Sequence, residues 1–369
     1  MLGRLTDSFL KKCWSDEDVK RYVGDYVGTY LTYACNEDVR EKSASGGTTT
    51  ALLIHGLKNN DFDGAVVCKA VIRGGKVRAE FCIATTEQEV LSARGSKYVE
   101  TNFLKEVLPL CREFEGRLAV VGLPCDITAL SRRCMKEAVL SDKVVLTIAL
   151  VCGHNSRTQL IDHVSKKLEL EAGKELVDYR FRVGHWRGRI EAEFDDGSVL
   201  TKPTKVFNDY QNLFFFCERK CMACNDHYGY NADVSVGDIW LFRLKVNPIK
   251  HTAVITRNSA GEDMYNSVIE SGAVRSSDID VRSIMDGQSR IGPSHYNVSA
   301  RYKVGKLLGI KLKDNDPIRV SWYSYLNAMI TLLNIRMSEK QWGQKLIFSM
   351  PRSVLKFYLY FKKGLESLK

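Results

Sequence analysis

Five of the eleven cysteines stand where thiolates could bind a metal. Cys221 and Cys224 form a Cys-x-x-Cys pair, which Cys217 precedes by four residues. Cys125 and Cys152 each follow a short apolar run that we expect to be a buried strand, and loops at the carboxyl ends of strands often bind ligands. Because four thiolates suit zinc and an iron–sulfur cluster equally well, this pattern predicts a metal centre and leaves its identity open.

Other interpretations of these cysteines stay open. An isolated Cys-x-x-Cys pair can be a redox dithiol or a coincidence. The spacing of Cys217, Cys221 and Cys224 also matches the cluster motif of radical-SAM enzymes, although that motif normally follows an early barrel strand and here it lies beyond residue 215. His154 and Asn155 directly follow Cys152, so they are either contacts around the centre or structural residues.

Two glycine-containing segments could hold a cofactor. The first opens an expected helix, whose N-terminal N–H groups and dipole favour a phosphate group; its alternative is an ordinary helix cap. In the second, Lys97 could pair with phosphate and Tyr98 could stack on a ring, or the segment could be a surface loop. Neither segment matches a Walker or G-x-G-x-x-G motif. The candidate residues are Ser45, Gly46, Gly47, Thr48, Gly95, Ser96, Lys97 and Tyr98.

Strand and helix patterns alternate through the first half of the chain, which predicts an α/β fold with a largely parallel or mixed sheet. The expected strands cover residues 63–72, 77–84, 118–122, 144–151 and 252–256, with a hairpin signal at 195–197 after strands over 177–183 and 188–194. The expected helices cover residues 48–56, 87–94, 102–114, 126–135, 158–170 and 261–271.

The net charge of +10 lies entirely at the C-terminal end of the chain. Residues 301–369 contain 14 Lys or Arg and 4 Asp or Glu, whereas residues 1–300 contain 40 of each. A neutral body argues against nucleic-acid binding. The basic, aromatic-rich tail predicts amphipathic helices that either cap the body or touch a membrane surface. We therefore divide the chain into an N-terminal segment (1–42), a body (43–300) and a basic helical extension (301–369).

The composition, with 44% hydrophobic and 27% charged residues, is that of a globular protein. We find no secretory signal and no apolar run long enough to span a bilayer, so we expect a cytoplasmic protein with membrane-surface contact as the alternative. No paired-carboxylate, Ser-His-Asp or His-Glu-x-x-His motif occurs, which argues against a hydrolase and leaves the catalytic residues unidentified.

Taken together, these motifs resemble the beta-subunit family of hydrogenases and dehydrogenases that use an 8-hydroxy-5-deazaflavin coenzyme, which is related to 7-hydroxymethyl chlorophyll a reductase. The resemblance runs from about residue 43 to 275. Its motifs, in order, are Ser45-Gly-Gly47, Gly95-Ser-Lys-Tyr98, Gly122-Leu-Pro-Cys125, the strand ending at Cys152, Cys221-x-x-Cys224 and Ala232-Asp-Val-Ser-Val-Gly237.

The resemblance implies an iron–sulfur flavoprotein that holds FAD and one [4Fe–4S] cluster. Cys125, Cys152, Cys221 and Cys224 would be the cluster ligands, with Cys217 a spare thiol that could replace one of them. The two glycine segments would hold the flavin. The implied activity is electron transfer between cluster and flavin, with a deazaflavin-type or other organic substrate and an electron donor such as ferredoxin or a deazaflavin coenzyme.

Departures from the family keep other functions open. Only Cys13 and Cys35 precede residue 43, too few for a second cubane, and the basic extension lies outside the shared core. One alternative is a membrane-surface adaptor stabilised by zinc. Another is an enzyme that keeps the flavin fold and acts on a glycan or a lipid-linked substrate. The substrate, the direction of electron flow and the oligomeric state stay open.

Overall fold

A computed structural model describes residues 13–368 and shows an eight-stranded mixed sheet. Its central strands β9, β5, β4 and β2 run parallel, and the outer strands pair antiparallel to their neighbours. The predicted α/β class with a mixed sheet is therefore confirmed. In sheet order the strands are β11 (Val274–Asp278), β1 (Gly28–Ala34), β10 (Thr252–Thr256), β9 (Val234–Asp238), β5 (Val144–Leu150), β4 (Leu118–Gly122), β2 (Gly64–Arg73) and β3 (Lys76–Ala84).

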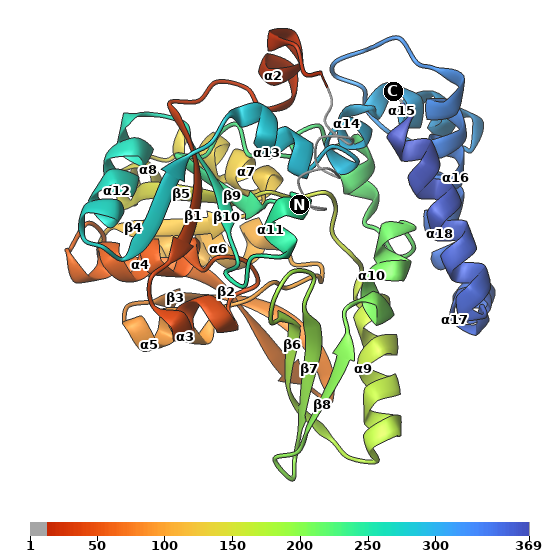
Figure 1. Ribbon diagram of the computed structural model, residues 1–369, viewed down its shortest axis with the longest axis horizontal. Helices are drawn as coiled ribbons and strands as arrows, with labels where there is room; N and C mark the ends of the chain where they lie inside the picture. The colour runs from red at the N-terminus through yellow and green to blue at the C-terminus, as the bar shows by residue number, and fades with distance from the viewer. Residues whose placement is uncertain (1–12, 369) are drawn as a thin grey trace.

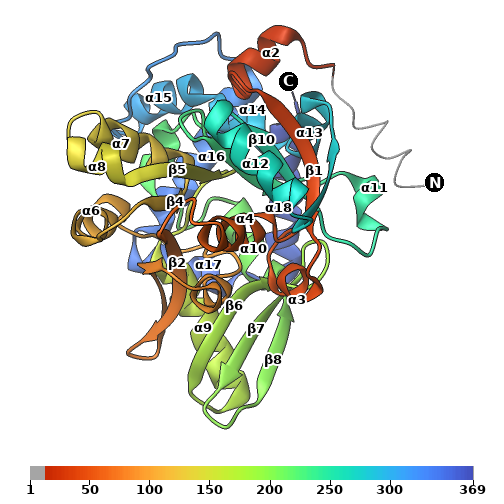
Figure 2. The same cartoon turned by 90° about the vertical axis from the view of Figure 1, so that its left-hand side faces the viewer.

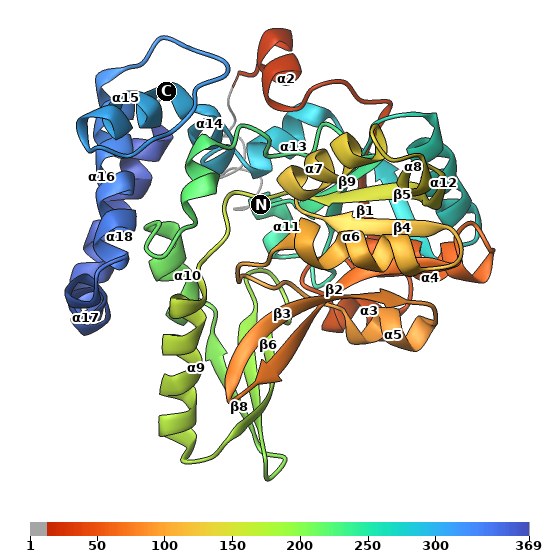
Figure 3. The same ribbon diagram turned by 180° about the vertical axis from the view of Figure 1, so that it is seen from behind.

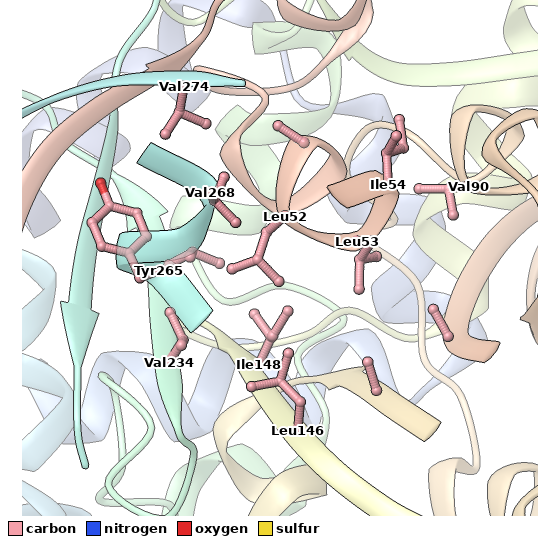
Figure 4. Close-up of a cluster of buried hydrophobic side chains, with 14 of the residues drawn as sticks. Leu52, Leu53, Ile54, Val90, Leu146, Ile148, Val234, Tyr265, Val268 and Val274 are labelled. Atoms are coloured by element: carbon pink, nitrogen blue, oxygen red, sulfur yellow. The ribbon is translucent and has the colours of Figure 1, made fainter. Parts of the chain in front are cut away.

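Helices cover both faces of this sheet, as alternating strands and helices require. Figure 4 shows Leu52 of one such helix packed near Ile148 of β5 and Val268. Figure 3 shows helices beside β4 and β5 at the back of the molecule. The first face carries α3 (Glu37–Lys42), α4 (Thr48–Lys58), α5 (Glu87–Ser92) and α12 (Ser259–Glu270). The second carries α6 (Phe103–Glu113), α7 (Pro124–Cys134), α8 (Ala138–Lys143), α2 (Asp16–Tyr22) and α13 (Val281–Gly287).

A second, three-stranded antiparallel sheet projects from the body (Figure 2). The turn at residues 195–197 connects its last two strands, as predicted, and Gly197 has a φ of 78° there, a value that L side chains rarely adopt. The sheet consists of β6 (Leu176–Val183), β7 (Arg189–Phe194) and β8 (Val199–Pro203), and it packs with α9 (Thr158–Ala172) and α10 (Lys205–Asn212).

The C-terminal helices stand beside α9 and α10, across from the main sheet (Figure 1). Leu332 and Ile335 of α16 are buried against the short 3-10 helix η1 (Arg219–Ala223), which contains Cys221. None of the described helices is long and apolar enough to cross a membrane. The remaining helices are α11 (Phe242–Lys245), α14 (Ile291–Tyr296), α15 (Val298–Leu307), α16 (Trp322–Ser338), α17 (Gln341–Ser349) and α18 (Arg352–Ser367).

The division into three segments stays a prediction. Strand β1 comes from the segment that we assigned to residues 1–42 and pairs with β10 and β11 in the main sheet. Helix α15 spans the boundary at residue 300.

The buried position of Leu52 gives a test of this core. Leu52 is 0% exposed whereas Leu170 is 73% exposed. We expect Leu52→Ala to lower the free energy of unfolding by about 2–5 kcal/mol, because it leaves a cavity in the packed core. Leu170→Ala should change it by less than about 0.5 kcal/mol. Equal midpoints for the two variants in urea denaturation would show that α4 does not pack as described.

Candidate functional site

A cavity of about 1010 Å³ lies at the carboxyl ends of the parallel strands. Gly122 of β4, Leu150 of β5 and Asp238 of β9 line it. This is the edge of an α/β sheet where ligands are expected. Arg182 of β6, Trp186 and Arg187 of the β6–β7 connection, and residues of α10 and α18 line other parts of the same cavity.

Both glycine segments that the sequence singled out line this cavity, and of their eight candidate residues only Gly46 does not. Ser45 and Gly46 are anchored to the start of β10: the Ser45 hydroxyl donates to the carbonyl of His251 at 2.6 Å, and the Gly46 N–H donates to Oγ1 of Thr252 at 2.8 Å. The polar groups of these two residues thus hold the loop in place.

The N-terminus of α4 faces the cavity through Gly47 and Thr48. Gly47 is the N-cap with a φ of 83°, and no side chain caps the helix. The hydroxyl of Thr48 is buried and has no hydrogen-bond partner among the described residues. Uncapped N–H groups, the helix dipole and a spare hydroxyl together favour an anionic group at this point.

Lys97 is held by the backbone of its own loop. Its ammonium donates to the carbonyls of Ala93, of Arg94 at 3.2 Å and of Gly95 at 2.9 Å. Burial lowers the pKa of Lys97 to about 8. Its hydrogen bonds are therefore made to the loop rather than to a ligand, although its side chain lines the cavity.

Tyr98 lines the cavity and packs on the second sheet. Its ring stacks on Phe207 of α10 at a centroid distance of 6.1 Å and meets Phe181 of β6 edge-on at 5.8 Å. Tyr98 therefore connects the cavity wall to the apolar core of the second sheet.

The four cysteines that the sequence grouped together are neighbours. Cys125 lies at the start of α7, Cys152 follows β5, and Cys221 and Cys224 belong to η1 and its C-cap. Burial raises the pKa of Cys152 well above its ordinary value, and the charges of Cys221, Cys125 and Cys224 raise it further. The charges of Cys224 and Cys221 also raise the pKa of Cys125, after burial and the charge of Asp126. Of the four, only Cys152 also lines the cavity.

In the described part of the chain, no three His, Cys, Asp or Glu side chains are close enough together to hold a single metal ion. The four thiols thus lie within range of one another's charge without being gathered as the ligands of one ion.

Of the four thiols, Cys221 ionises most readily. A hydrogen bond from Cys217 lowers the pKa of Cys221 against the effect of burial, and the backbone N–H of Asn155 donates to its sulfur at 3.4 Å. Burial in turn raises the pKa of Cys217 well above its ordinary value. Cys217 is thus the protonated partner of this pair, and its thiol is also within hydrogen-bond distance of the carbonyl of Glu218 at 3.4 Å. Asn155 contacts the cysteine group, as one of its two sequence interpretations predicted.

A buried arginine that the sequence did not point to lies beside these cysteines. Arg301 of α15 donates to the carbonyls of Met222 at 2.8 Å, Ser294 at 2.7 Å and His295 at 2.6 Å. It forms no ion pair with a carboxylate of residues 13–368. Burial lowers its pKa to about 10, and the negative charges of Cys224, Cys217 and Cys221 act in the opposite direction. Of the acidic groups among residues 13–368, these three thiols act on Arg301 most strongly, and they offset its charge when they are ionised.

Two buried histidines, His227 and His295, and the half-buried His154 fix the loop that follows Cys152. Nδ1 of His227 bonds to the carbonyl of Cys152 at 2.9 Å, and Nδ1 of His295 bonds to that of Gly153 at 2.8 Å. His154 bonds through Nε2 to the carbonyl of Gln211 at 3.0 Å. Burial lowers the pKa of His227 and His154 to about 4. These neutral imidazoles position the loop, and His154 lines the cavity as well.

An ion pair joins the two sheets at the cavity. Nη1 of Arg182 in β6 donates to Oδ2 of Asp238 in β9 at 2.5 Å, and the guanidinium lies 4.7 Å from the ring centroid of Trp240. Arg182 is buried and Asp238 is half-buried, and a hydrogen-bonded ion pair of this kind holds the walls in one arrangement.

Comparison with known proteins identifies the family of this chain. Residues 29–108 match the N-terminal part, and residues 115–282 the C-terminal part, of the family described as the beta subunit of coenzyme F420 hydrogenase/dehydrogenase. The chain belongs to this family. The family resemblance that the sequence motifs indicated is therefore confirmed. The family is one of oxidoreductase subunits.

Individual proteins of the F420 hydrogenase/dehydrogenase family are similar to this chain in sequence and in fold. The coenzyme F420 hydrogenase beta subunits of Methanosarcina barkeri and Methanococcus voltae are each 24% identical; the matches cover 68% and 70% of this chain and 81% and 86% of theirs. A chain in the F420-reducing [NiFe] hydrogenase complex from Methanosarcina barkeri has the same fold, with a TM-score of 0.60 and 19% identity over 80% of this chain and 98% of its own.

The lowered pKa of Lys97 gives a pH-dependent test. A neutral amine reacts with acylating reagents, so modification of Lys97 in the folded chain should reach half its maximum near pH 8. In the urea-unfolded chain the same residue should need a pH of about 10.4. Peptide mass spectrometry after brief acetylation measures both profiles. Identical profiles before and after unfolding would contradict the buried position of this ammonium.

Proposed function

We propose that this protein is an iron–sulfur flavoprotein oxidoreductase. In this proposal Cys125, Cys152, Cys221 and Cys224 hold a [4Fe–4S] cluster, and FAD occupies the cavity. The observation that carries the proposal is the position of Cys152, which belongs to the cysteine group and also lines the cavity. A cluster on these thiols would adjoin whatever molecule the cavity holds.

The donor set and its surroundings favour a cluster. Each thiolate of a cubane binds a different iron atom, so four neighbouring thiols need not converge on one point. An unpaired buried guanidinium is costly, and the negative charge of a thiolate-bound cluster would offset the charge of Arg301. Hydrogen bonds from Cys217 and Asn155 favour the thiolate form of Cys221, which is the form that binds iron.

The cavity favours a large cofactor with a phosphate group. Its volume of about 1010 Å³ is at the upper end of the range for ligand pockets. The uncapped N-terminus of α4 and the unpartnered hydroxyl of Thr48 would receive a phosphate group. Gly95 has a φ of 86°, and a Cβ added there would meet no heavy atom within 4 Å, so the second segment is open to a close approach.

When bound, the two groups would let the protein exchange electrons one at a time at the cluster and in pairs at the flavin. The residues of this chain bind and orient both groups. Asp238 and Arg182 fix the two sheets around the cavity, and His227 and His295 fix the loop between Cys152 and His154. This division of labour is typical of cofactor enzymes, in which the protein supplies position and electrostatics.

The family suggests the class of partner and substrate. Its named relatives are F420 hydrogenase subunits, so a deazaflavin coenzyme or ferredoxin as electron donor, and a deazaflavin-type or other organic substrate, form part of this proposal. Association with further subunits also belongs to it, since the structurally similar chain is found in a hydrogenase complex. Cytoplasmic location and contact of residues 301–369 with a membrane surface stay predictions.

Paired cysteine variants test the cluster. We expect Cys152→Ser, purified anaerobically as the full chain, to lose most of its iron, because one of the four ligands is gone. The control Cys134→Ser changes a half-buried cysteine at the end of α7 that belongs to neither the cysteine group nor the cavity, and it should keep the iron of the wild type. Iron assays and visible absorbance measure both, with circular dichroism to confirm folding.

Flavin content tests the other half of the proposal on the same samples. The wild type and Cys134→Ser should release FAD on heating, measured by its fluorescence. A folded Cys152→Ser variant that retains full iron would refute the ligand assignment. A folded wild type without flavin would refute the assignment of the cavity.

A further inference from the structure

The C-terminal part of the chain builds one wall of the cavity. Residues 286–291, from the end of α13 to the start of α14, line it together with Tyr360, Lys363 and Ser367 of α18. The two family matches end at residue 282. These residues therefore come from sequence beyond the matched family range. They can give the cavity of this chain a binding property that the matched range does not supply.

Two cations of this wall, Arg290 before α14 and Lys363 of α18, meet Arg187 from the β6–β7 connection, which lies within the matched family range. Burial lowers the pKa of Lys363, and the charges of Arg290 and Arg187 lower it further. Burial and the charge of Arg290 also lower the pKa of Arg187. The three side chains are thus close enough to repel one another.

The carboxylates nearby do not cancel these charges. Glu366 of α18 is the ion-pair partner of Arg290 and also of the buried Lys362. Asp209 of α10 is near Lys363 and Arg187, but within residues 13–368 neither of these cations forms an ion pair. Asp286, the third carboxylate of the wall, accepts a hydrogen bond from the indole of Trp14 at 2.8 Å. Three carboxylates thus face the four cations Arg187, Arg290, Lys362 and Lys363, and the wall keeps an excess of positive charge.

Hydrogen bonds and an ion pair also hold Arg290 in a fixed position in this wall. Nη2 of Arg290 donates to Oδ1 of Asn212 at 3.0 Å, and Nδ2 of Asn212 donates to the carbonyl of Asn208 at 2.7 Å. The second guanidinium nitrogen of Arg290 is fixed by Glu366. Because Arg290 is already positioned, it loses little side-chain freedom when an anion binds.

We propose that Arg187, Arg290 and Lys363 form a subsite for a phosphate or diphosphate group. Guanidinium groups match the oxygens of phosphate with paired hydrogen bonds, and a lysine adds a point charge. The group could belong to a phosphorylated substrate or to the diphosphate of the cofactor. The inference rests on the proposed function only in taking the cavity as the binding site.

Inorganic diphosphate is the probe, titrated calorimetrically into the full chain. The wild type should bind it, and the double variant Arg187→Gln/Lys363→Gln should bind it at least about tenfold more weakly, since each charged hydrogen bond contributes strongly. The matched control Arg352→Gln/Lys356→Gln removes two positive charges from α18 at exposed positions that do not line the cavity. It should bind diphosphate as the wild type does.

The possible outcomes distinguish three questions: whether the subsite exists, which molecule carries the phosphate that it binds, and whether the proposed function is correct. The subsite would be overturned if the wild type binds no diphosphate while Arg187→Gln/Lys363→Gln keeps its flavin, or if both double variants weaken diphosphate binding equally. If Arg187→Gln/Lys363→Gln keeps its flavin but loses diphosphate binding, the phosphate belongs to a substrate; if it loses flavin as well, the phosphate is that of the cofactor. A chain without iron or flavin that still binds diphosphate through these residues would refute the proposed function and retain the subsite.

Discussion

The buried positive charge of Arg301 must be offset by negative charge, and this requirement constrains the rest of the structure. A guanidinium that is buried among backbone carbonyls, with no carboxylate to pair with in the described chain, needs negative charge from some other source. Among residues 13–368, the acidic groups that act most strongly on it are the thiols of Cys224, Cys217 and Cys221, followed by Asp314. The cysteine group and the arginine therefore stabilise each other best when the sulfurs are ionised, which is the state that a metal cluster imposes.

This pair of features also explains the position of the C-terminal helices. Arg301 is the first residue of the segment that we predict to be a basic extension, and α15 and α16 bury Ala300, Leu332 and Ile335 against the helix that carries Cys221. Farther along, α18 closes the cavity with Lys363. The excess of basic residues in this segment thus includes charges that face the cavity and the cysteines, in addition to those on the surface.

Much of this architecture follows from local pattern. The strands predicted at 118–122 and 252–256 have the bounds that the structure shows, because β-branched and apolar runs between polar loops have few alternatives. The grouping of Cys125 and Cys152 follows from their places after parallel strands, whose ends meet at one edge of the sheet. Strand β1 is not predicted, because its tyrosines and threonines do not alternate clearly and its partners lie more than two hundred residues away.

Interactions between distant residues account for what local pattern could not provide. Nothing near Arg301 in the sequence distinguishes it from the other bases of the tail, and its role depends on the carbonyls of Met222 and His295. The same is true of Lys97, for which the pattern left open a phosphate contact or a surface loop and which the fold surrounds with carbonyl oxygens.

The metal content of the wild-type chain tests the proposed cluster most directly. The full chain, purified without exposure to oxygen, should contain about four iron atoms and about four acid-labile sulfides, the content of one [4Fe–4S] cluster. It should also give an electron paramagnetic resonance signal after reduction. A folded chain that contains zinc and neither iron nor sulfide would contradict the proposal.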